Sequence, residues 1–223
     1  MNLVLSYILI PFIKWGQYFF YLIILLIATN KRFGWFSYFS KINLKSLIWQ
    51  ILGFKIFYAS VETFSQYYVW SSNNLTKLLL DKNALDFNLL KQVSGKLFLF
   101  LDNRFGYFIF YSWGRFWLEI IVSLVAALAF YCFLIFLKKY KARFFEEGEV
   151  ELGFLLALMV GWSNFIVFLP LVFVGVVFVS IFRMIVFKEM YTTLGAPLLL
   201  AALVVLLSGN YLVSLFGLMP LRV

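Results

Sequence analysis

Residues 152–187 form a stretch of 36 residues in which Arg183 is the only charged side chain. As a single helix this stretch would measure about 54 Å, whereas the hydrocarbon core of a bilayer is about 30 Å thick. The stretch is therefore too long for one crossing, and residues 161–164, Gly-Trp-Ser-Asn, mark the expected break. We predict a short helix that ends at Val160 and a longer helix that begins at Phe165.

Four further apolar stretches fit helices in a membrane, which brings the expected bundle to about six transmembrane helices. Their bounds are 3–28, 47–61, 117–137 and 194–218. Composition agrees, because 64% of the 223 residues are hydrophobic and only 13% are charged, against about 25% charged residues in an ordinary soluble domain. We therefore expect an all-α integral membrane protein with a single polytopic membrane domain over residues 1–223.

The stretches are unevenly spaced along the chain. Residues 1–62 hold the first two helices, and residues 115–218 hold the remaining ones. Between them, residues 63–114 contain only short apolar runs that polar and charged residues interrupt. The pattern predicts a long loop there, with an amphipathic helix lying on the membrane surface around residues 75–93.

Basic residues gather in the expected loops 29–45 and 138–151. Loops of multi-pass membrane proteins that are rich in Lys and Arg face the cytoplasm, so we predict that both loops are cytoplasmic and that both termini lie outside. The net charge of +9 suits contact with anionic lipid headgroups. The lipid bilayer is the expected partner, and no motif in the sequence points to nucleic acid.

Two totals restrict the chemistry. The chain has no histidine, which excludes histidine-based zinc, haem and diiron sites, catalytic triads and imidazole proton relays. It has a single cysteine, Cys132, which can form neither an internal disulfide nor a paired-cysteine metal site. We predict no metal and no cofactor, and acid–base catalysis would have to use Asp, Glu, Lys or Tyr.

Four of the ten acidic residues lie within six positions, at the predicted cytoplasmic start of the helix that follows the basic loop. They are Glu146, Glu147, Glu149 and Glu151. One interpretation is electrostatic, because acids favour a helix N-terminus and offset the preceding basic residues. Glu149 differs from the others, since it follows Gly148 and opens an apolar helix, where a carboxylate can lie at the membrane boundary.

A family resemblance appears at this cluster. Residues 146–162, EEGEVELGFLLALMVGW, resemble the GxGDxKLxxxxxxxxGW element of type IV prepilin leader peptidases, which are membrane aspartic peptidases of the GxGD type. Glu149 takes the position of the catalytic Asp, and Glu151 that of the usual Lys. The other matched positions are Gly148, Leu152, Gly161 and Trp162.

The resemblance continues downstream and covers residues 115–218. Residues 193–198, TLGAPL, are similar to the PFGPFL element of the family, with Gly195 matched and Pro197 displaced by one position. The resemblance implies a bacterial cytoplasmic membrane protein whose partners are type IV pilin-like precursor helices. It also implies an aspartic endopeptidase that removes leader peptides, in which two carboxylates at the cytoplasmic surface activate water.

Several positions depart from the family pattern. The motif reads Glu146-Glu147-Gly148-Glu149, so its first Gly and its Asp are both replaced by Glu. The best counterpart of the element after the family's first Asp is residues 73–76, Asn-Asn-Leu-Thr, which lacks Ile-Pro and has Ser65 where the Asp would fall. Asp102 is the other candidate for the first carboxylate. These departures imply impaired or lost endopeptidase activity.

Three hypotheses follow. The first is an active peptidase that pairs Glu149 with Asp102 or Glu62, although the predicted topology puts those partners on the opposite side of the membrane. The second is a degenerate relative that binds a pilin-type hydrophobic helix without cutting it, which the altered motif positions favour. The third is a small membrane transporter or an assembly or scaffold protein unrelated to proteolysis.

The predicted topology is testable by cysteine labelling in a Cys132→Ala background. With Lys82→Cys or Glu189→Cys as the single cysteine, a membrane-impermeant maleimide should label position 82 only from outside and position 189 only from the cytoplasm. Labelling of both positions from the same side would contradict the six-helix layout.

Overall fold

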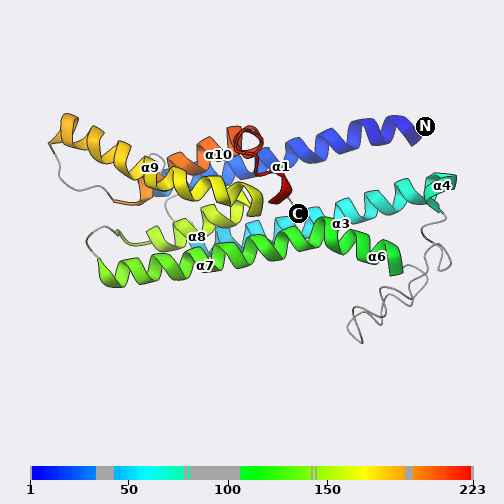
Figure 1. The fold of residues 1–223 in the computed structure, drawn as a ribbon, viewed down its shortest axis with the longest axis horizontal. Helices are drawn as coiled ribbons and strands as arrows, with labels where there is room; N and C mark the ends of the chain where they lie inside the picture. The colour runs from blue at the N-terminus through cyan, green and yellow to red at the C-terminus, as the bar shows by residue number, and fades with distance from the viewer. Residues whose placement is uncertain are drawn as a thin grey trace. The chain divides into compact units, whose positions relative to one another are not determined.

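The computed structural model describes residues 2–33, 43–77, 80, 106–141, 143, 145–188 and 193–221. Over these residues the regular secondary structure is helical, and the same residues contain no β-strand (Figure 1). Within this part of the chain, three helices are long and apolar enough to cross a membrane: Gly106–Tyr140, Trp162–Val186 and Gly195–Leu215. The all-helical prediction is confirmed, and these three helices support association with a membrane.

The chain divides into two compact units, residues 1–51 with 123–222, and residues 52–122. The first unit contains α1 (Asn2–Phe33), most of α7 (Leu118–Tyr140), α8 (Glu149–Val160), α9 (Trp162–Phe187) and α10 (Gly195–Leu215). The second unit contains most of α3 (Leu44–Ser72), the short helices α4 (Asn74–Lys77) and α6 (Gly106–Ser112), and a π-helix, η3 (Trp113–Trp117). A final 3-10 turn, η5, covers Met219–Leu221.

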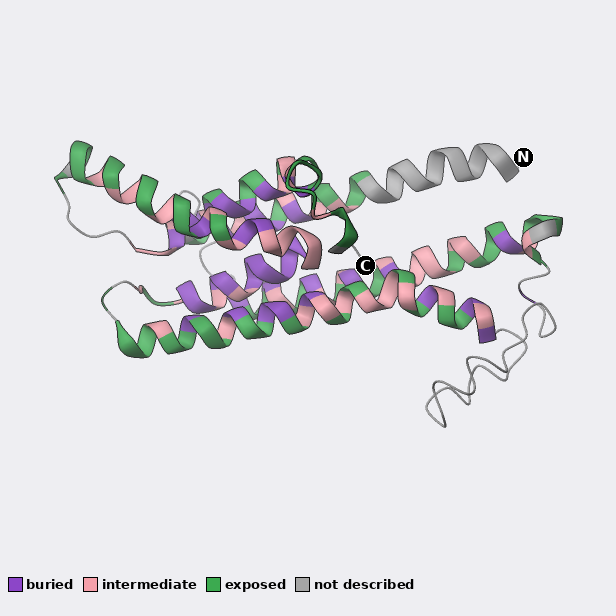
Figure 2. Ribbon diagram, viewed as in Figure 1, coloured by how far each residue is buried: buried purple, intermediate pink, exposed green. Residues whose placement is uncertain are grey.

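The centre of the first unit is α8. Ten of its 12 residues are buried, whereas the C-terminal half of α9 is exposed or half-buried along most of its length (Figure 2). After its first turn, α8 is apolar on every face. A helix of this kind is typically buried. α10 packs against both α8 and α9 and also contacts α1.

The break predicted at residues 161–164 is confirmed, and it is shorter than expected. Only Gly161 lies between the helices, with φ 82° and ψ 170°, a region that is essentially restricted to glycine. The chain reverses at this residue (Figure 1). Helix α9 begins at Trp162 and not at Phe165, because side chains satisfy the backbone at once: Ser123 Oγ accepts the Trp162 N–H at 2.9 Å, and Asn164 Nδ2 donates to the Val160 carbonyl at 3.4 Å.

A glycine of α10 allows close packing next to this break. Helix α10 continues through Gly209, and a Cβ at this residue would lie 2.9 Å from Asn164 Oδ1. The adjacent Asn210 donates from Nδ2 to the hydroxyl of Tyr18 on α1 at 3.0 Å. Gly209 and Asn210 thus bring α10 close to α9 and α1, respectively. The helix α10 continues through both residues without a break.

Two helices are longer than the sequence predicted. The second ends at Ser72 and not near residue 61, and the third begins at Gly106 and not near Trp117. The two extensions lie in the region that was expected to be a loop, and they contact each other through aromatic rings. A search for long apolar stretches does not detect such contacts. Of the amphipathic helix expected around residues 75–93, α4 and Leu80 fall within the described residues, and the remainder lies outside them.

Packing of α8 against α7 depends on Gly153. A Cβ at this position would collide with Leu134 Cδ1, and Leu134 is only 1% exposed. Gly153→Ala is therefore expected to destabilise the protein by about 1–3 kcal/mol. The measurement is the midpoint of thermal unfolding in detergent, followed by circular dichroism.

The matched control is Gly53→Ala on α3, where a Cβ would meet nothing within 4 Å. Since alanine is the better helix former, this variant is expected to be neutral or more stable by about 0.4–1 kcal/mol. Equal midpoints for the two variants would contradict the proposed close contact between α8 and α7.

Candidate functional site

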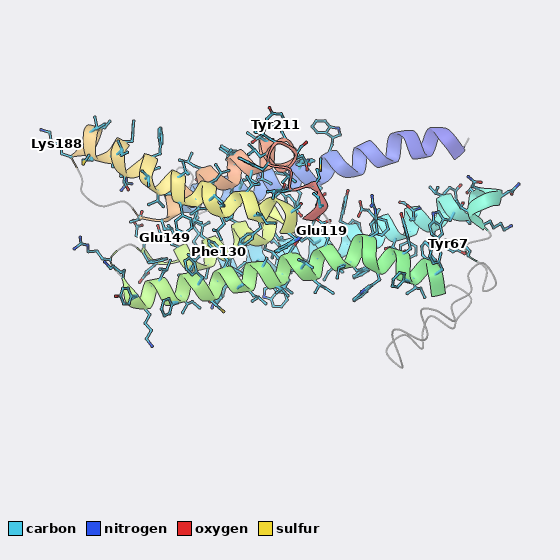
Figure 3. The ribbon with its side chains drawn as sticks, in the orientation of Figure 1. Tyr67, Glu119, Phe130, Glu149, Lys188 and Tyr211 are labelled. Atoms are coloured by element: carbon cyan, nitrogen blue, oxygen red, sulfur yellow. The ribbon has the colours of Figure 1, made fainter. Side chains whose placement is uncertain are left out.

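Glu149 is the first residue of α8 (Figure 3). The residue is only 1% exposed. Both carboxylate oxygens accept hydrogen bonds from backbone amides. Oε1 accepts from the Gly195 N–H at 2.7 Å, and Oε2 accepts from the Glu146 N–H at 3.1 Å. The carboxylate thus joins the start of α8 to a residue 46 positions further along the chain.

Gly195 is the first residue of α10, so the carboxylate lies at two helix N-termini. The first N–H groups of a helix have no partner within the helix, and the aligned peptide dipoles place partial positive charge there. A carboxylate that receives such N–H groups makes charge-assisted hydrogen bonds, which are shorter and stronger than neutral ones. Glu149 therefore acts as a clamp that holds the beginnings of α8 and α10 together.

The local chain is shaped to present this side chain. Gly148 precedes α8 in the left-handed region with φ 84°, which glycine adopts at little cost. The Glu149 N–H donates to the Glu146 carbonyl at 3.3 Å and closes a tight turn. The Leu152 N–H then donates to the Gly148 carbonyl at 2.8 Å, which begins the helical ladder.

The remaining motif residues all lie on the same bundle. Leu152 is buried on α8, and Trp162 is half-buried at the start of α9. Pro197 is buried in the first turn of α10, where its missing N–H costs no helical hydrogen bond. A Cβ at Gly175 of α9 would lie 3.6 Å from Pro197 Cβ, so α9 and α10 approach closely here.

The four clustered acids have different surroundings. Glu146 and Glu147 are exposed, Glu151 is half-buried, and Glu149 is buried. The electrostatic interpretation of the cluster suits the exposed members, which lie at the N-terminal end of α8. Glu149 is distinguished from them by burial and by its reach to α10.

The sequence offered two candidates for a partner carboxylate, Asp102 and Glu62. Asp102 falls outside the residues that the structure describes. Glu62 lies on α3 within the second compact unit. Among the described residues there is no group of three or more His, Cys, Asp or Glu side chains that could hold a metal ion.

Ser123 and Asn164 support the site and were not singled out from the sequence. Ser123 is 1% exposed on α7 and accepts the first N–H of α9. The feature that could have indicated Ser123 is its hydroxyl group within the otherwise strongly apolar stretch 117–137. Asn164 lies within the predicted break, and its Oδ1 is buried against Gly209 of α10.

No protein-family model, curated protein or solved structure matches this chain. The peptidase comparison therefore depends on the motif residues themselves. Their geometry adds one observation, that the two separate motif segments meet through the hydrogen bond between Glu149 and Gly195.

An aspartic peptidase needs two carboxylates that share a proton and hold a water molecule between them. Glu149 instead directs one oxygen to each of two backbone amides. In this arrangement the carboxylate accepts from the first residue of α10 and from the turn before α8.

Removal of the clamp is expected to destabilise the bundle. Glu149→Ala leaves the buried Gly195 amide without its acceptor and should lower the free energy of unfolding by about 1.5–3 kcal/mol. Glu149→Gln keeps one acceptor oxygen and should lie between wild type and alanine. Thermal unfolding in detergent provides the comparison.

Glu147→Gln is the control, because Glu147 belongs to the same acidic cluster and is exposed. Its effect should stay within about 0.5 kcal/mol of wild type. If Glu149→Ala were as stable as Glu147→Gln, the clamp would have no role in holding α8 to α10.

Proposed function

We propose that this chain is a prepilin-peptidase-like integral membrane protein that binds a pilin-type hydrophobic helix and does not cleave it. The observation that carries the proposal is the state of Glu149. The residue at the motif position of the catalytic Asp is 1% exposed, and each of its oxygens accepts a backbone N–H. A buried, clamped carboxylate suits the maintenance of the fold better than the activation of water.

The change from Asp to Glu supports the same conclusion. Glu carries one more methylene, and a misplacement of about 1 Å in a catalytic group can cost on the order of 100-fold in rate. In this chain the glutamate accepts the α10 amide N–H at 2.7 Å. The proposal therefore assigns this motif position a role in holding the helices and not in hydrolysis.

Exposed apolar surface supports binding of a hydrophobic helix. Large apolar side chains on α9 from its middle to its C-terminal end remain exposed after the first unit has packed: Phe173, Val174, Val177, Phe178, Ile181 and Phe182. Helices associate in membranes through close van der Waals packing and interhelical hydrogen bonds. This face of α9 could receive the apolar N-terminal helix of a pilin precursor.

Cleavage is tested by co-expression with prepilin-type precursors encoded in the same genome. We expect the wild-type chain to remove no more leader peptide than cells lacking it, measured by the mass shift of the precursor. An active prepilin peptidase expressed with the same precursors is the positive control. Leader removal by wild type that is lost in Glu149→Gln would overturn the non-hydrolytic proposal.

Binding is tested separately with a photo-crosslinking amino acid in α9. A crosslinker at Phe178, which is 68% exposed, should capture the precursor, whereas one at Val125 on α7, which is 60% exposed, should not. Equal capture at both sites would indicate random collision in the bilayer. Capture at neither site, together with no cleavage, would favour a transporter or scaffold unrelated to prepilins.

A further inference from the structure

The helix Gly106–Tyr140 is longer than a bilayer core is thick. Its 35 residues measure about 52 Å, and the core is about 30 Å thick. Between Glu119 and Lys138 there is no charged residue, and these 18 residues alone measure about 27 Å. Residues 120–137 therefore match the core by themselves, and residues 106–119 extend beyond it.

The extension is paired with the C-terminal half of α3 inside the second compact unit. Trp117 donates from Nε1 to Thr63 Oγ1 at 3.3 Å. Farther along, Trp70 is 7% exposed and meets three aromatic rings at centroid distances of 5.0–6.0 Å: Tyr107, Phe108 and Tyr111. We call residues 62–72 and 106–119 together the outer arm.

The base of the outer arm has the composition of a membrane interface. The π-helix Trp113–Trp117 reads WGRFW, so a cation lies between two tryptophans. Counted from Ile120, Arg115 and Trp113 lie about 8 and 10 Å beyond the core, near the outer side of the headgroup layer. Trp113 is 47% exposed and Arg115 is exposed, so both side chains can reach lipid.

An arm immersed in hydrocarbon would bring Arg115 and Glu119 into the core. Charged side chains within a bilayer are costly and are normally paired or directed towards water. Both residues are exposed on the helix surface. The charges thus fix the position of the membrane along this helix more sharply than its total apolar length does.

We infer that the outer arm stands outside the hydrocarbon core and that Trp113 and Arg115 bind the phospholipid headgroup layer at its base. The indole ring suits the amphipathic headgroup region, and the guanidinium suits the lipid phosphates. The aromatic cluster around Trp70 then lies beyond the headgroups, on the end of the helix away from Lys138. This inference is independent of whether the chain binds or cleaves a prepilin.

A depth measurement along this single helix tests the inference. An environment-sensitive fluorophore is attached to one cysteine at a time in a Cys132→Ala background, at Ile109, Gly114 or Val125. Ile109 and Val125 are exposed, and a Cβ at Gly114 would meet nothing within 4 Å, so Trp113 and Arg115 are both retained. The protein is placed in phosphatidylcholine and phosphatidylglycerol vesicles. Three quenchers are compared: iodide in water, a nitroxide on the lipid headgroup and a nitroxide deep in the acyl chain.

Each quencher should act most strongly at a different position. We expect iodide to be strongest at 109, the headgroup nitroxide at 114 and the acyl-chain nitroxide at 125. Lipid quenching at 109 as strong as at 114 would place the arm in the bilayer and overturn the inference. Absence of headgroup quenching at 114 would equally overturn the proposed contact. Retained helicity, measured by circular dichroism, is required of each labelled variant.

Charge reversal tests the part played by Arg115. Arg115→Glu should reduce headgroup quenching at position 114 at least twofold in vesicles that contain phosphatidylglycerol. Lys77→Glu is the control, because Lys77 is an exposed cation on α4. Equal reductions in the two variants would show a general effect of net charge and would remove Arg115 from the contact.

Discussion

The hydrogen bonds of the Glu149 carboxylate hold the first unit of this bundle together at one end. One oxygen accepts from the α10 amide of Gly195 and the other from the turn before α8, so the beginnings of two helices are held by one side chain. Beyond that attachment, α10 packs against α8, α9 and α1. Burial of this polar side chain is tolerated because two backbone N–H donors replace water.

The sequence predicted the helical class of the fold and the break at Gly161. Both depend on local properties, namely runs of apolar residues and the backbone freedom of glycine. The limits of α3 and of the helix starting at Gly106 were not predicted, because both helices continue through charged and polar residues at which the apolar pattern stops. The contacts of Trp70 with Tyr107 and Tyr111 stabilise both helices beyond the ends of their apolar stretches. Such pairing joins distant residues, so no local pattern reveals it.

The candidate site could be predicted in part, because some of its features also depend on local sequence. Gly148 and Gly161 take backbone conformations with φ above 80°, so their places in the motif have a physical basis in this chain. Glu149 was singled out because it follows a glycine and opens an apolar helix. Its partner could not be identified, since the donor is a backbone amide and any residue carries one. Ser123 likewise acts on a backbone group from another helix.

The burial of α8 has a consequence for how the protein is made. With 12 residues, α8 is about 18 Å long, too short to be stabilised in lipid as an independent segment. Buried as it is, it has almost no surface left for acyl chains. In a bilayer, α8 is therefore expected to insert together with α9 as one hairpin, and it is fully buried only after α10, which follows both in the chain, has packed against it.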